Sequence, residues 1–374
     1  MEEASTSVRV PVKHKLEDEG EDEEVVNKRA KEIELPDDKF SSHVADHYNK
    51  IENTGLKLRE QSKIFYLRNF NNWIKGCLID VYLHKTDRVQ NVLDLCCGKG
   101  GDLLKWIVAR IRHLVCADIA WKCIEQCESR YRDFCNRNQR IFTCEFITAD
   151  CSRARLKEKY RDPEIQFDLV SCQFSFHYCF ESLPQAERML QNATECLKLG
   201  GYFIGTIPCA NEIVKRIKKS GSKLLKSKMF SIEMYSEEPY PLFGAKYDFH
   251  LDSVVQCPEF LVHFPTFVRL AEKYGLVLDH RSSFAEFYEK YSRDEKKRFI
   301  LKKMCALEQF SLRDEDKISS YEYEYAEKCC REKDYNGIVG TLSKSEWEAI
   351  SLYQVFAFKK VRNYQFDENG VKLT

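Results

Sequence analysis

The stretch Val92-Leu93-Asp94-Leu95-Cys96-Cys97-Gly98-Lys99-Gly100-Gly101-Asp102 decides the fold class. A short, mostly apolar run is followed by a glycine-rich turn, and a helical pattern begins at Asp102. Glycines in such a turn allow positive φ and let the backbone pass close to a ligand. In open α/β sheets, ligands bind outside the carboxyl ends of the strands, most often at the first strand-to-helix turn. The stretch therefore predicts a strand, a ligand-binding turn and a helix.

The chain on both sides of this stretch alternates short apolar runs with longer amphipathic segments. We expect strands at 91–95, 113–118, 142–149, 167–176 and 202–207, and helices at 102–110, 122–136 and 185–197. Strands separated by helices of about ten to fifteen residues form parallel βαβ units with right-handed crossovers. The sequence therefore predicts an α/β protein with a doubly wound, mostly parallel sheet.

The remaining segments are less regular. We expect helix in much of 41–90, strands within 228–263, helices at 267–274 and 284–305, and a last helix and strand within 347–358. Residues 311–336 are polar and predict an insertion or lobe. The predicted organisation is a charged tail at 1–40, one domain at 41–362 and a C-terminal tail at 363–374.

The N-terminal 40 residues alternate acidic and basic blocks and contain no aromatic residue before Phe40. Such a segment buries too little apolar surface to fold alone, so it is predicted to be disordered. Its basic clusters, Lys13-His14-Lys15 and Lys28-Arg29-Ala30-Lys31, are typical of nuclear import signals. A charge-patterned, solvated tail explains the same residues.

The composition excludes some classes of protein. Lysine plus arginine equals aspartate plus glutamate at 59 each, so binding of a polyanion needs a local basic patch. No apolar run reaches the roughly 18 residues of a membrane span, and Met1-Glu2-Glu3 does not begin a secretory signal. The 17 cysteines contain no CxxC pair facing a second pair, so we expect reduced intracellular thiols and no metal site.

Two classes of cofactor fit the glycine-rich turn. A dinucleotide fold needs G-x-G-x-x-G with pyrophosphate at the helix N-terminus, whereas this turn reads G-x-G-G and places Asp102 there. That carboxylate would repel pyrophosphate but suits a cationic sulfonium and ammonium. Asp118 ends the next strand, where it suits two ribose hydroxyls. These features favour S-adenosylmethionine, and a tight turn without a ligand is the remaining interpretation.

Two further positions support a site at this edge of the sheet. Asp150 follows the third strand, where it could accept a hydrogen bond from the adenine amino group, or could simply cap a helix. Residues 172–178 end the fourth strand, above the place where a transferring methyl group would lie. If no ligand binds there, His177 would be an ordinary surface histidine.

Six motifs, found in order over about residues 44–360, resemble the eukaryotic mRNA cap guanine-N7 methyltransferases. They are Phe65–Trp73, Asp94-Leu95 with Gly98–Asp102, Phe174–Tyr178, Tyr240–Gly244 with Lys246-Tyr247, Pro258–Val262 and Leu342–Trp347. The resemblance implies a seven-stranded class I methyltransferase sheet that uses S-adenosylmethionine to methylate the cap of mRNA. It also implies action in the nucleus, no DNA or membrane partner and, in some members, a small activating subunit. We expect that subunit to contact residues 311–336.

The resemblance also implies two sets of site residues. The cofactor would be bound by Lys75, Cys96, Gly98, Asp118, Asp150, Gln173 and Tyr178. The cap would be bound by Asn71, Asn72, Lys99, Lys105, Arg130, His177, Glu259 and Tyr353. A carboxylate can accept hydrogen bonds from guanine N1–H and from the exocyclic amine. Flat rings can stack on the base, and basic side chains can bind the triphosphate. On helical spacing alone, Lys105 and Arg130 would form a solvated helix face.

The implied mechanism is an in-line attack of guanine N7 on the sulfonium methyl group. N7 has a free lone pair and carries no proton, so we assign no general base and no catalytic residue beyond those that align the reactants.

Two residues depart from the family pattern. Cys96 stands where the family has the first glycine of the turn, and strain of roughly 1–3 kcal/mol follows if this position needs positive φ. Trp121 is bulkier than the small or acidic residue expected after Asp118. The rival hypothesis is therefore a cap-binding protein whose methyl transfer is impaired by Cys96, and a small-molecule methyltransferase is a weaker rival.

Overall fold

The computed structural model describes residues 37–50, 62–86, 90–137, 141–251, 255–318, 320–332 and 337–364. These residues belong to one compact unit spanning residues 35–374. The two basic clusters, nearly all of the predicted N-terminal tail and most of the predicted C-terminal tail lie outside the described residues. Residues 39 and 40 of the predicted tail already belong to a helix.

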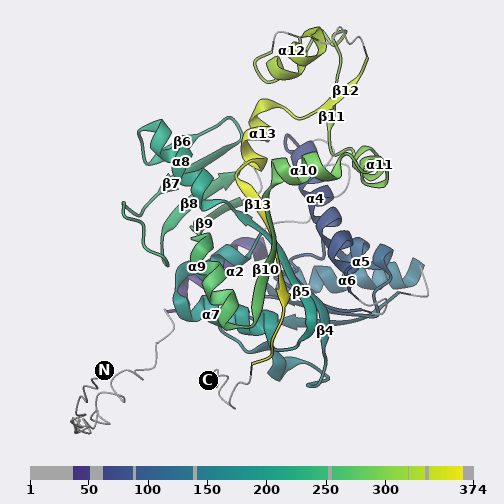
Figure 1. The fold of residues 1–374 in the computed structure, drawn as a ribbon, viewed down its shortest axis with the longest axis vertical. Helices are drawn as coiled ribbons and strands as arrows, with labels where there is room; N and C mark the ends of the chain where they lie inside the picture. Colours follow the sequence, from purple (N-terminus) through teal and green to yellow (C-terminus); the bar gives the residue numbers. More distant parts are fainter. Residues whose placement is uncertain are drawn as a thin grey trace, which may run out of the picture. The chain divides into compact units, whose positions relative to one another are not determined.

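A seven-stranded sheet in the order β10-β13-β5-β4-β1-β2-β3 forms the centre of the unit (Figure 1). Its strands are β1 (Asn91–Leu95), β2 (His113–Asp118), β3 (Thr143–Thr148), β4 (Phe167–Gln173), β5 (Leu197–Pro208), β10 (Leu276–Ser283) and β13 (Tyr353–Lys360). The first five are parallel, whereas β13 is antiparallel to both β5 and β10. The predicted doubly wound, mostly parallel α/β sheet is confirmed.

Side chains alternate between the two faces of the sheet, as the period of a strand requires. Val92, Leu114 and Leu169 belong to one buried cluster, with residues of α4 (Phe65–Leu83), α5 (Leu103–Ala109) and α10 (Phe284–Tyr291). The next residue of each strand, Leu93, Val115 and Val170, belongs to a second cluster, with residues of α7 (Leu183–Thr194) and α9 (Phe264–Lys273). Helices thus cover both faces of the sheet. Because neither face meets water, the strands are apolar along nearly their whole length.

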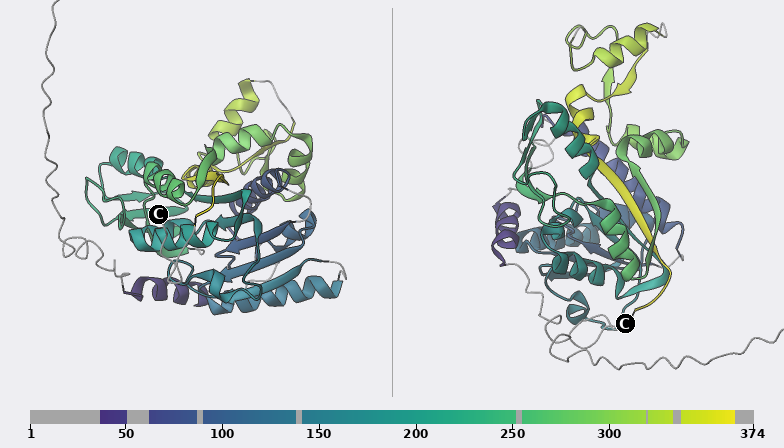
Figure 2. Two further views of the ribbon diagram at one scale, coloured as in Figure 1. Left: turned by 60° about the horizontal axis from the view of Figure 1, so that its bottom comes forward. Right: turned by 60° about the vertical axis from the view of Figure 1, so that its left-hand side comes forward.

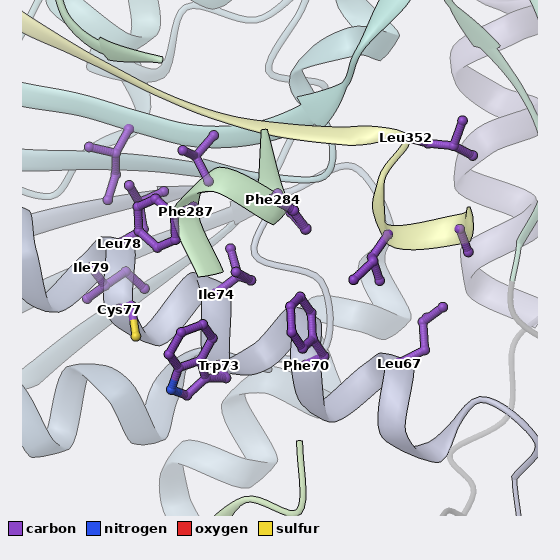
Figure 3. Close-up of a cluster of buried hydrophobic side chains, with 14 of the residues drawn as sticks. Leu67, Phe70, Trp73, Ile74, Cys77, Leu78, Ile79, Phe284, Phe287 and Leu352 are labelled. Carbon is purple, nitrogen blue, oxygen red and sulfur yellow. The ribbon is translucent and has the colours of Figure 1, made fainter. Parts of the chain in front are cut away.

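Helix α4 shows why one resemblance motif has its sequence. Leu67, Phe70 and Ile74 recur at intervals of three and four and face Phe284 and Phe287 of α10 (Figure 3). Ile64 provides no side-chain cap for α4. Instead Glu346 Oε1, from the capping box of α13 (Lys344–Ile350), accepts a hydrogen bond from Leu67 N–H at 3.1 Å. The Leu342–Trp347 motif therefore caps two helices.

Several segments differ from their predicted boundaries, and for three of them the structure shows what replaces the prediction. The strand predicted at 202–207 begins at Leu197, because Gly200 at φ +80° lies in a register shift between β5 and β4 that lets the strand continue. The helix predicted at 284–305 is two helices, since Asp294 caps a new one, α11 (Glu295–Lys303), after a break at Ser292. The strand predicted at 167–176 ends at Gln173, and a 3₁₀ helix (Phe176–Glu181) follows.

Two smaller elements are added to the sheet. The strand-rich segment forms an antiparallel sheet of β6 (Leu224–Lys226), β7 (Phe230–Met234), β8 (Lys246–Leu251) and β9 (Val255–Phe260), preceded by α8 (Ala210–Ser220). The predicted polar lobe contains α12 (Glu324–Glu332) between β11 (Glu308–Phe310) and β12 (Val339–Thr341), with a core of Phe310, Ala326 and Cys330. Among the described residues, no helix is both long and apolar enough to cross a bilayer.

Candidate functional site

A cavity of about 430 Å³ opens at the carboxyl ends of β1, β2, β3 and β4. All seven residues predicted to bind the cofactor line it: Lys75, Cys96, Gly98, Asp118, Asp150, Gln173 and Tyr178. They come from five separate segments of the chain, and the parallel strand order brings four of these segments to one edge of the sheet. This is the place where open α/β sheets bind their ligands.

Asp118 connects the end of β2 to the glycine-rich turn. Its Oδ2 accepts a hydrogen bond from Gly98 N–H at 2.8 Å, and its Oδ1 accepts one from Ala120 N–H at 2.9 Å. Burial raises the pKa of this carboxyl to about 7, although both backbone N–H groups act in the opposite direction. The side chain is therefore an acceptor held in place by its own loop and directed at the cavity.

The glycines of the turn have different reasons to be glycine. Gly100 has φ +72°, and a Cβ there would lie 2.7 Å from both Cys127 Sγ and Leu103 Cδ1, so no side chain fits. Gly98 has φ +53° and open space where its Cβ would be, which leaves room for a ligand. The backbone conformation of the turn therefore brings it close to the cavity.

Cys96 has φ +56°, so the first position of the turn does require the left-handed region. The condition for the expected strain, a positive φ at a residue with a side chain, is therefore present. The side chain packs on the second buried cluster and also lines the cavity. Trp121, the other departure, begins α6 (Trp121–Arg137), is 53% exposed and is not among the cavity-lining residues. Its bulk therefore takes no space from the cavity.

Asp102, next to the turn, is held between two lysines. Lys75 Nζ lies 2.9 Å and Lys105 Nζ 2.6 Å from Asp102 Oδ1, and all three side chains are at most 15% exposed. Burial opposes ionisation of Asp102, but the two ammonium groups prevail and hold its pKa below the usual value. The interpretation of Lys105 as a solvated helix residue is wrong, because Asp102, Gly101 O and Asn72 Oδ1 surround its ammonium group.

Asp150 and Gln173 complete the wall at β3 and β4. Asp150 Oδ1 accepts from Ser152 N–H and Ser152 O–H, so it closes a turn rather than capping a helix. Its Oδ2 is buried and makes no hydrogen bond with the described residues. Gln173 Nε2 donates to Ser171 Oγ at 3.0 Å, and its Oε1 accepts from Thr206 Oγ1. Arg153 Nε lies 3.5 Å from this oxygen, which can still accept a hydrogen bond from a ligand.

Helix is predicted within 41–90, but sequence reasoning did not connect α2 (Lys39–Lys50) with the cavity, to which it supplies one wall through Phe40, Val44 and Tyr48. Tyr48 Oη lies 3.1 Å from Tyr178 Oη. In Figure 2, α2 lies beside α6, and Lys122 N–H donates to Asn49 Oδ1 at 3.1 Å. The spacing i, i+4, i+8 of the three lining residues is a helical signal that the sequence does contain.

The predicted cap residues fall into two groups. His177 and Glu259 are 1% and 4% exposed, with His177 Nε2 3.3 Å from Glu259 Oε1, and Tyr247 O–H donates to Glu259 Oε2 at 2.6 Å. The interpretation of His177 as a surface histidine is therefore wrong. Both of its ring nitrogens lack a hydrogen bond with the described residues. Burial raises the pKa of Tyr353, and the Glu259 carboxylate adds to the effect.

Phe174 and Tyr178 join this buried group to the cavity. Both line the cavity, and the Phe174 ring lies 5.2 Å from that of Tyr353 while the Tyr178 ring lies 4.4 Å from that of His177.

The second group lies around the glycine-rich turn. Lys99 and Arg130 line the cavity, and Asn72 accepts from Lys105 at 3.3 Å. Asn71 Oδ1 is buried and makes no hydrogen bond with the described residues. The cationic members of this group lie at the turn and on α5 and α6, as recognition of a polyphosphate requires.

The residues present fit S-adenosylmethionine. An adenosine and a cationic sulfonium need hydrogen-bond acceptors, which Asp118 and Asp150 supply. They also need space and a closely approaching backbone, which the structure provides at Gly98 and Gly100.

Comparison with known proteins gives one consistent result. The model of the mRNA (guanine-N(7))-methyltransferase domain matches residues 32–361. The mRNA cap guanine-N(7) methyltransferase of Drosophila melanogaster is 48% identical over 349 residues, covering 88% of this chain and 79% of its own. The protein of the same name from Caenorhabditis elegans is 41% identical over 339 residues, covering 86% and 88%. That of Oryza sativa, numbered 1, is 37% identical over 326 residues, covering 85% and 80%.

Proposed function

Since this chain belongs to the mRNA (guanine-N7)-methyltransferase family, we propose how its own residues carry out the transfer of a methyl group from S-adenosylmethionine to N7 of the cap guanosine. The enzyme class and the cofactor follow from the family. The roles of single residues, the mechanism, the partner and the location in the cell are proposals.

The observation that supports the residue roles best is the position of buried polar atoms that make no hydrogen bond with the described residues. Asp150 Oδ2 lies at the cavity, with Arg153 Nε 3.5 Å away, and His177 Nδ1 and Asn71 Oδ1 are two further such atoms. A buried polar atom without a hydrogen bond costs stability unless a ligand supplies one. These atoms therefore support a site for a cofactor and a base.

The cofactor set acts through matched acceptors. Asp118 accepts hydrogen bonds from the two ribose hydroxyls, and Asp150 Oδ2 accepts one from the adenine amino group. Gly98 allows the backbone to lie against the ligand. S-adenosylmethionine supplies a methyl group on a cationic sulfonium when it is bound. The Asp102 carboxylate is already matched by Lys75 and Lys105, so it holds these two ammonium groups in place instead of attracting the sulfonium. This role differs from the one that the sequence suggested.

The cap set orients guanine. Glu259, fixed by Tyr247 O–H, accepts from guanine N1–H and the exocyclic amine, and His177 and Tyr353 offer flat faces beside it. Lys99 and Arg130 meet the triphosphate. Because N7 carries no proton, these residues need only align N7 and exclude water, and no general base is assigned.

The alternative is a cap-binding protein in which the Cys96 strain prevents methyl transfer. A test is incubation of the purified chain with GpppG-capped RNA and S-adenosylmethionine labelled in its methyl group. Cap-dependent label at guanine N7 supports the enzyme. Binding of cap analogue without transfer supports the alternative. A matched substrate with 7-methylguanosine already in the cap should accept no label at N7.

Members of this family work on new transcripts, so we also propose a nuclear location, directed by Lys13–Lys15 and Lys28–Lys31. Replacing the lysines and arginine of both clusters with alanine should move a fluorescent fusion of the full chain into the cytoplasm. An unchanged nuclear signal would remove these residues from the proposal.

A small activating subunit is proposed to bind the polar lobe and α11. Large apolar side chains are exposed there: Phe299 at 65%, Ile300 at 46%, Tyr321 at 66%, Tyr325 at 78% and Ile338 at 61%. A cavity of about 290 Å³ lies beside α12, lined by Tyr325 and Cys329 among others. Such an exposed apolar area is typical of an interface. Replacing Tyr321 and Tyr325 with serine should weaken binding of the family's activating subunit, and unchanged binding by calorimetry would reject this site.

A further inference from the structure

Three cysteines that are distant in sequence meet beneath the glycine-rich turn. The sulfur atoms of Cys97, Cys116 and Cys127 all lie within 4.8 Å of one another. Cys97 belongs to the turn after β1, Cys116 to β2 and Cys127 to α6. Their spacing in the sequence gave no sign of this cluster, because it is formed by parallel strand pairing and by a helix crossing.

The chemistry of the cluster is that of a soft ligand set. All three are free thiols, and an odd number of thiols cannot be fully consumed by disulfide formation. A zinc ion with Zn–S bonds of about 2.3 Å holds its sulfurs roughly 3.8–4.0 Å apart in tetrahedral or trigonal geometry. Sulfurs already within 4.8 Å need only small shifts to reach that spacing. Thiolates prefer Zn²⁺ and softer ions to Mg²⁺ or Ca²⁺.

The cluster is accessible from the cofactor cavity. Cys116 and Cys127 are buried, whereas Cys97 is half-buried and lines the cavity. An ion that enters the cavity therefore meets Cys97 first. A tetrahedral ion would keep one position for a water molecule or for a fourth protein ligand.

The cluster is also coupled mechanically to the turn. A Cβ built on Gly100 would lie 2.7 Å from Cys127 Sγ, so the backbone of the turn rests directly on this sulfur. Cys97 N–H donates to Ala117 O at 3.1 Å, and Gly98 N–H donates to Asp118 at 2.8 Å. Drawing the three sulfurs together must move Cys97, which lies next to the Gly98 contact with Asp118.

We propose that Cys97, Cys116 and Cys127 form a binding site for Zn²⁺ and softer thiophilic ions such as Cd²⁺, and that the bound ion weakens binding of S-adenosylmethionine. Binding forms three metal–sulfur bonds and releases the three thiol protons to solvent. Linkage requires the effect to be reciprocal, so the cofactor weakens metal binding by the same factor.

The test is a titration of the reduced, full-length protein with Cd²⁺, followed by the ultraviolet charge-transfer band of cadmium thiolate. We expect one ion per chain. Cys116→Ser and Cys127→Ser should each weaken binding at least tenfold. Cys196→Ser is the matched control, because Cys196 is also a free thiol, is 2% exposed and lies outside the cluster. Absence of the band, or equal binding by all variants, would overturn the proposal.

Cofactor affinity is measured by calorimetry in the same samples. One equivalent of Cd²⁺ should weaken binding of S-adenosylhomocysteine by about fivefold or more in the wild-type chain and should leave the Cys127→Ser chain unchanged. An equal effect in both would show that the ion acts elsewhere. Failure of cofactor binding in metal-free protein would instead contradict the proposed cofactor site, so the two failures are distinguishable.

If the serine variants do not fold, the wild-type chain still decides the question. Zn²⁺ should slow alkylation of Cys97, which lines the cavity, as followed by peptide mass spectrometry. X-ray absorption of the zinc complex should give sulfur neighbours at about 2.3 Å. Unchanged alkylation, or a zinc shell of nitrogen and oxygen alone, would overturn the proposal.

Discussion

Replacing Cys96 with glycine should strengthen cofactor binding by a small and calculable amount. Cys96 holds φ +56° in the turn that lines the cofactor cavity. The left-handed region of φ and ψ costs a residue with a side chain about 1–2 kcal/mol, whereas glycine adopts it without this cost. This strain opposes cofactor binding to the extent that the turn leaves the left-handed region when no cofactor is bound.

Glycine also has a cost, since it loses about 0.5–1 kcal/mol more conformational entropy than alanine when the turn is ordered. Subtracting the two ranges leaves a gain of about 0–1.5 kcal/mol, and the middle of this range corresponds to roughly three- to fourfold in Kd. We therefore expect the Cys96→Gly chain to bind S-adenosylhomocysteine about threefold more tightly.

Calorimetry measures this difference, and Cys96→Ala is the matched control. Alanine removes the sulfur but keeps Cβ and therefore the strain. If Cys96→Ala gains as much affinity as Cys96→Gly, the bulk of the sulfur and not the backbone is responsible, and the reasoning is refuted. Weaker binding by both would show that the sulfur itself contributes to the pocket.

Three further predictions follow from the site. Burial raises the pKa of Asp118 to about 7, so cofactor affinity should fall as pH is lowered through 7, and Asp118→Asn should abolish that dependence in calorimetry between pH 6 and pH 8. Because burial raises the pKa of Asp118, the cofactor-free chain should be more stable below the usual aspartate pKa of 3.8, and this contribution is lost as pH rises towards about 7. Glu259→Gln should raise KM for capped RNA about tenfold or more with the Kd of S-adenosylhomocysteine unchanged, and a parallel change in both would contradict the assignment to the cap. Asp102→Asn leaves Lys75 and Lys105 buried without their counter-ion and should lower the free energy of unfolding by about 3 kcal/mol in urea denaturation. Glu128→Gln, which removes an exposed pair with Arg132, is its control and should cost less than about 1 kcal/mol.

The central sheet was predictable from sequence because local and tertiary preferences agree there. The strand at 91–95 and the turn at 96–101 carry both the apolar pattern and the glycines that their positions require. The break at Ser292 was missed because residues 292–298 contain no glycine or proline to mark it, although Asp294 starts a new helix there. The start of β5 at Leu197 was not predicted, because the register shift around Gly200 depends on the partner strand.

The candidate site was predictable to a different extent. Six of the seven cofactor residues meet in one cavity because parallel order brings the strand ends together, whereas Lys75 reaches it from helix α4. The pairing of Lys105 with Asp102 and the burial of His177 depend on tertiary packing, which spacing does not encode. Helix α2 was not connected with the cavity, since nothing local relates Tyr48 to Tyr178 across 130 residues.

The position of β13 has a consequence for biosynthesis. Among the described residues this strand comes last, yet it lies between β5 and β10 and carries Tyr353. While the ribosome is still making residues 353–360, β5 and β10 have completed their sequence but have no partner between them. Unpaired strand edges favour association with other chains. A chain whose synthesis has not yet reached residue 360 therefore presents two unpaired strand edges and is prone to aggregate.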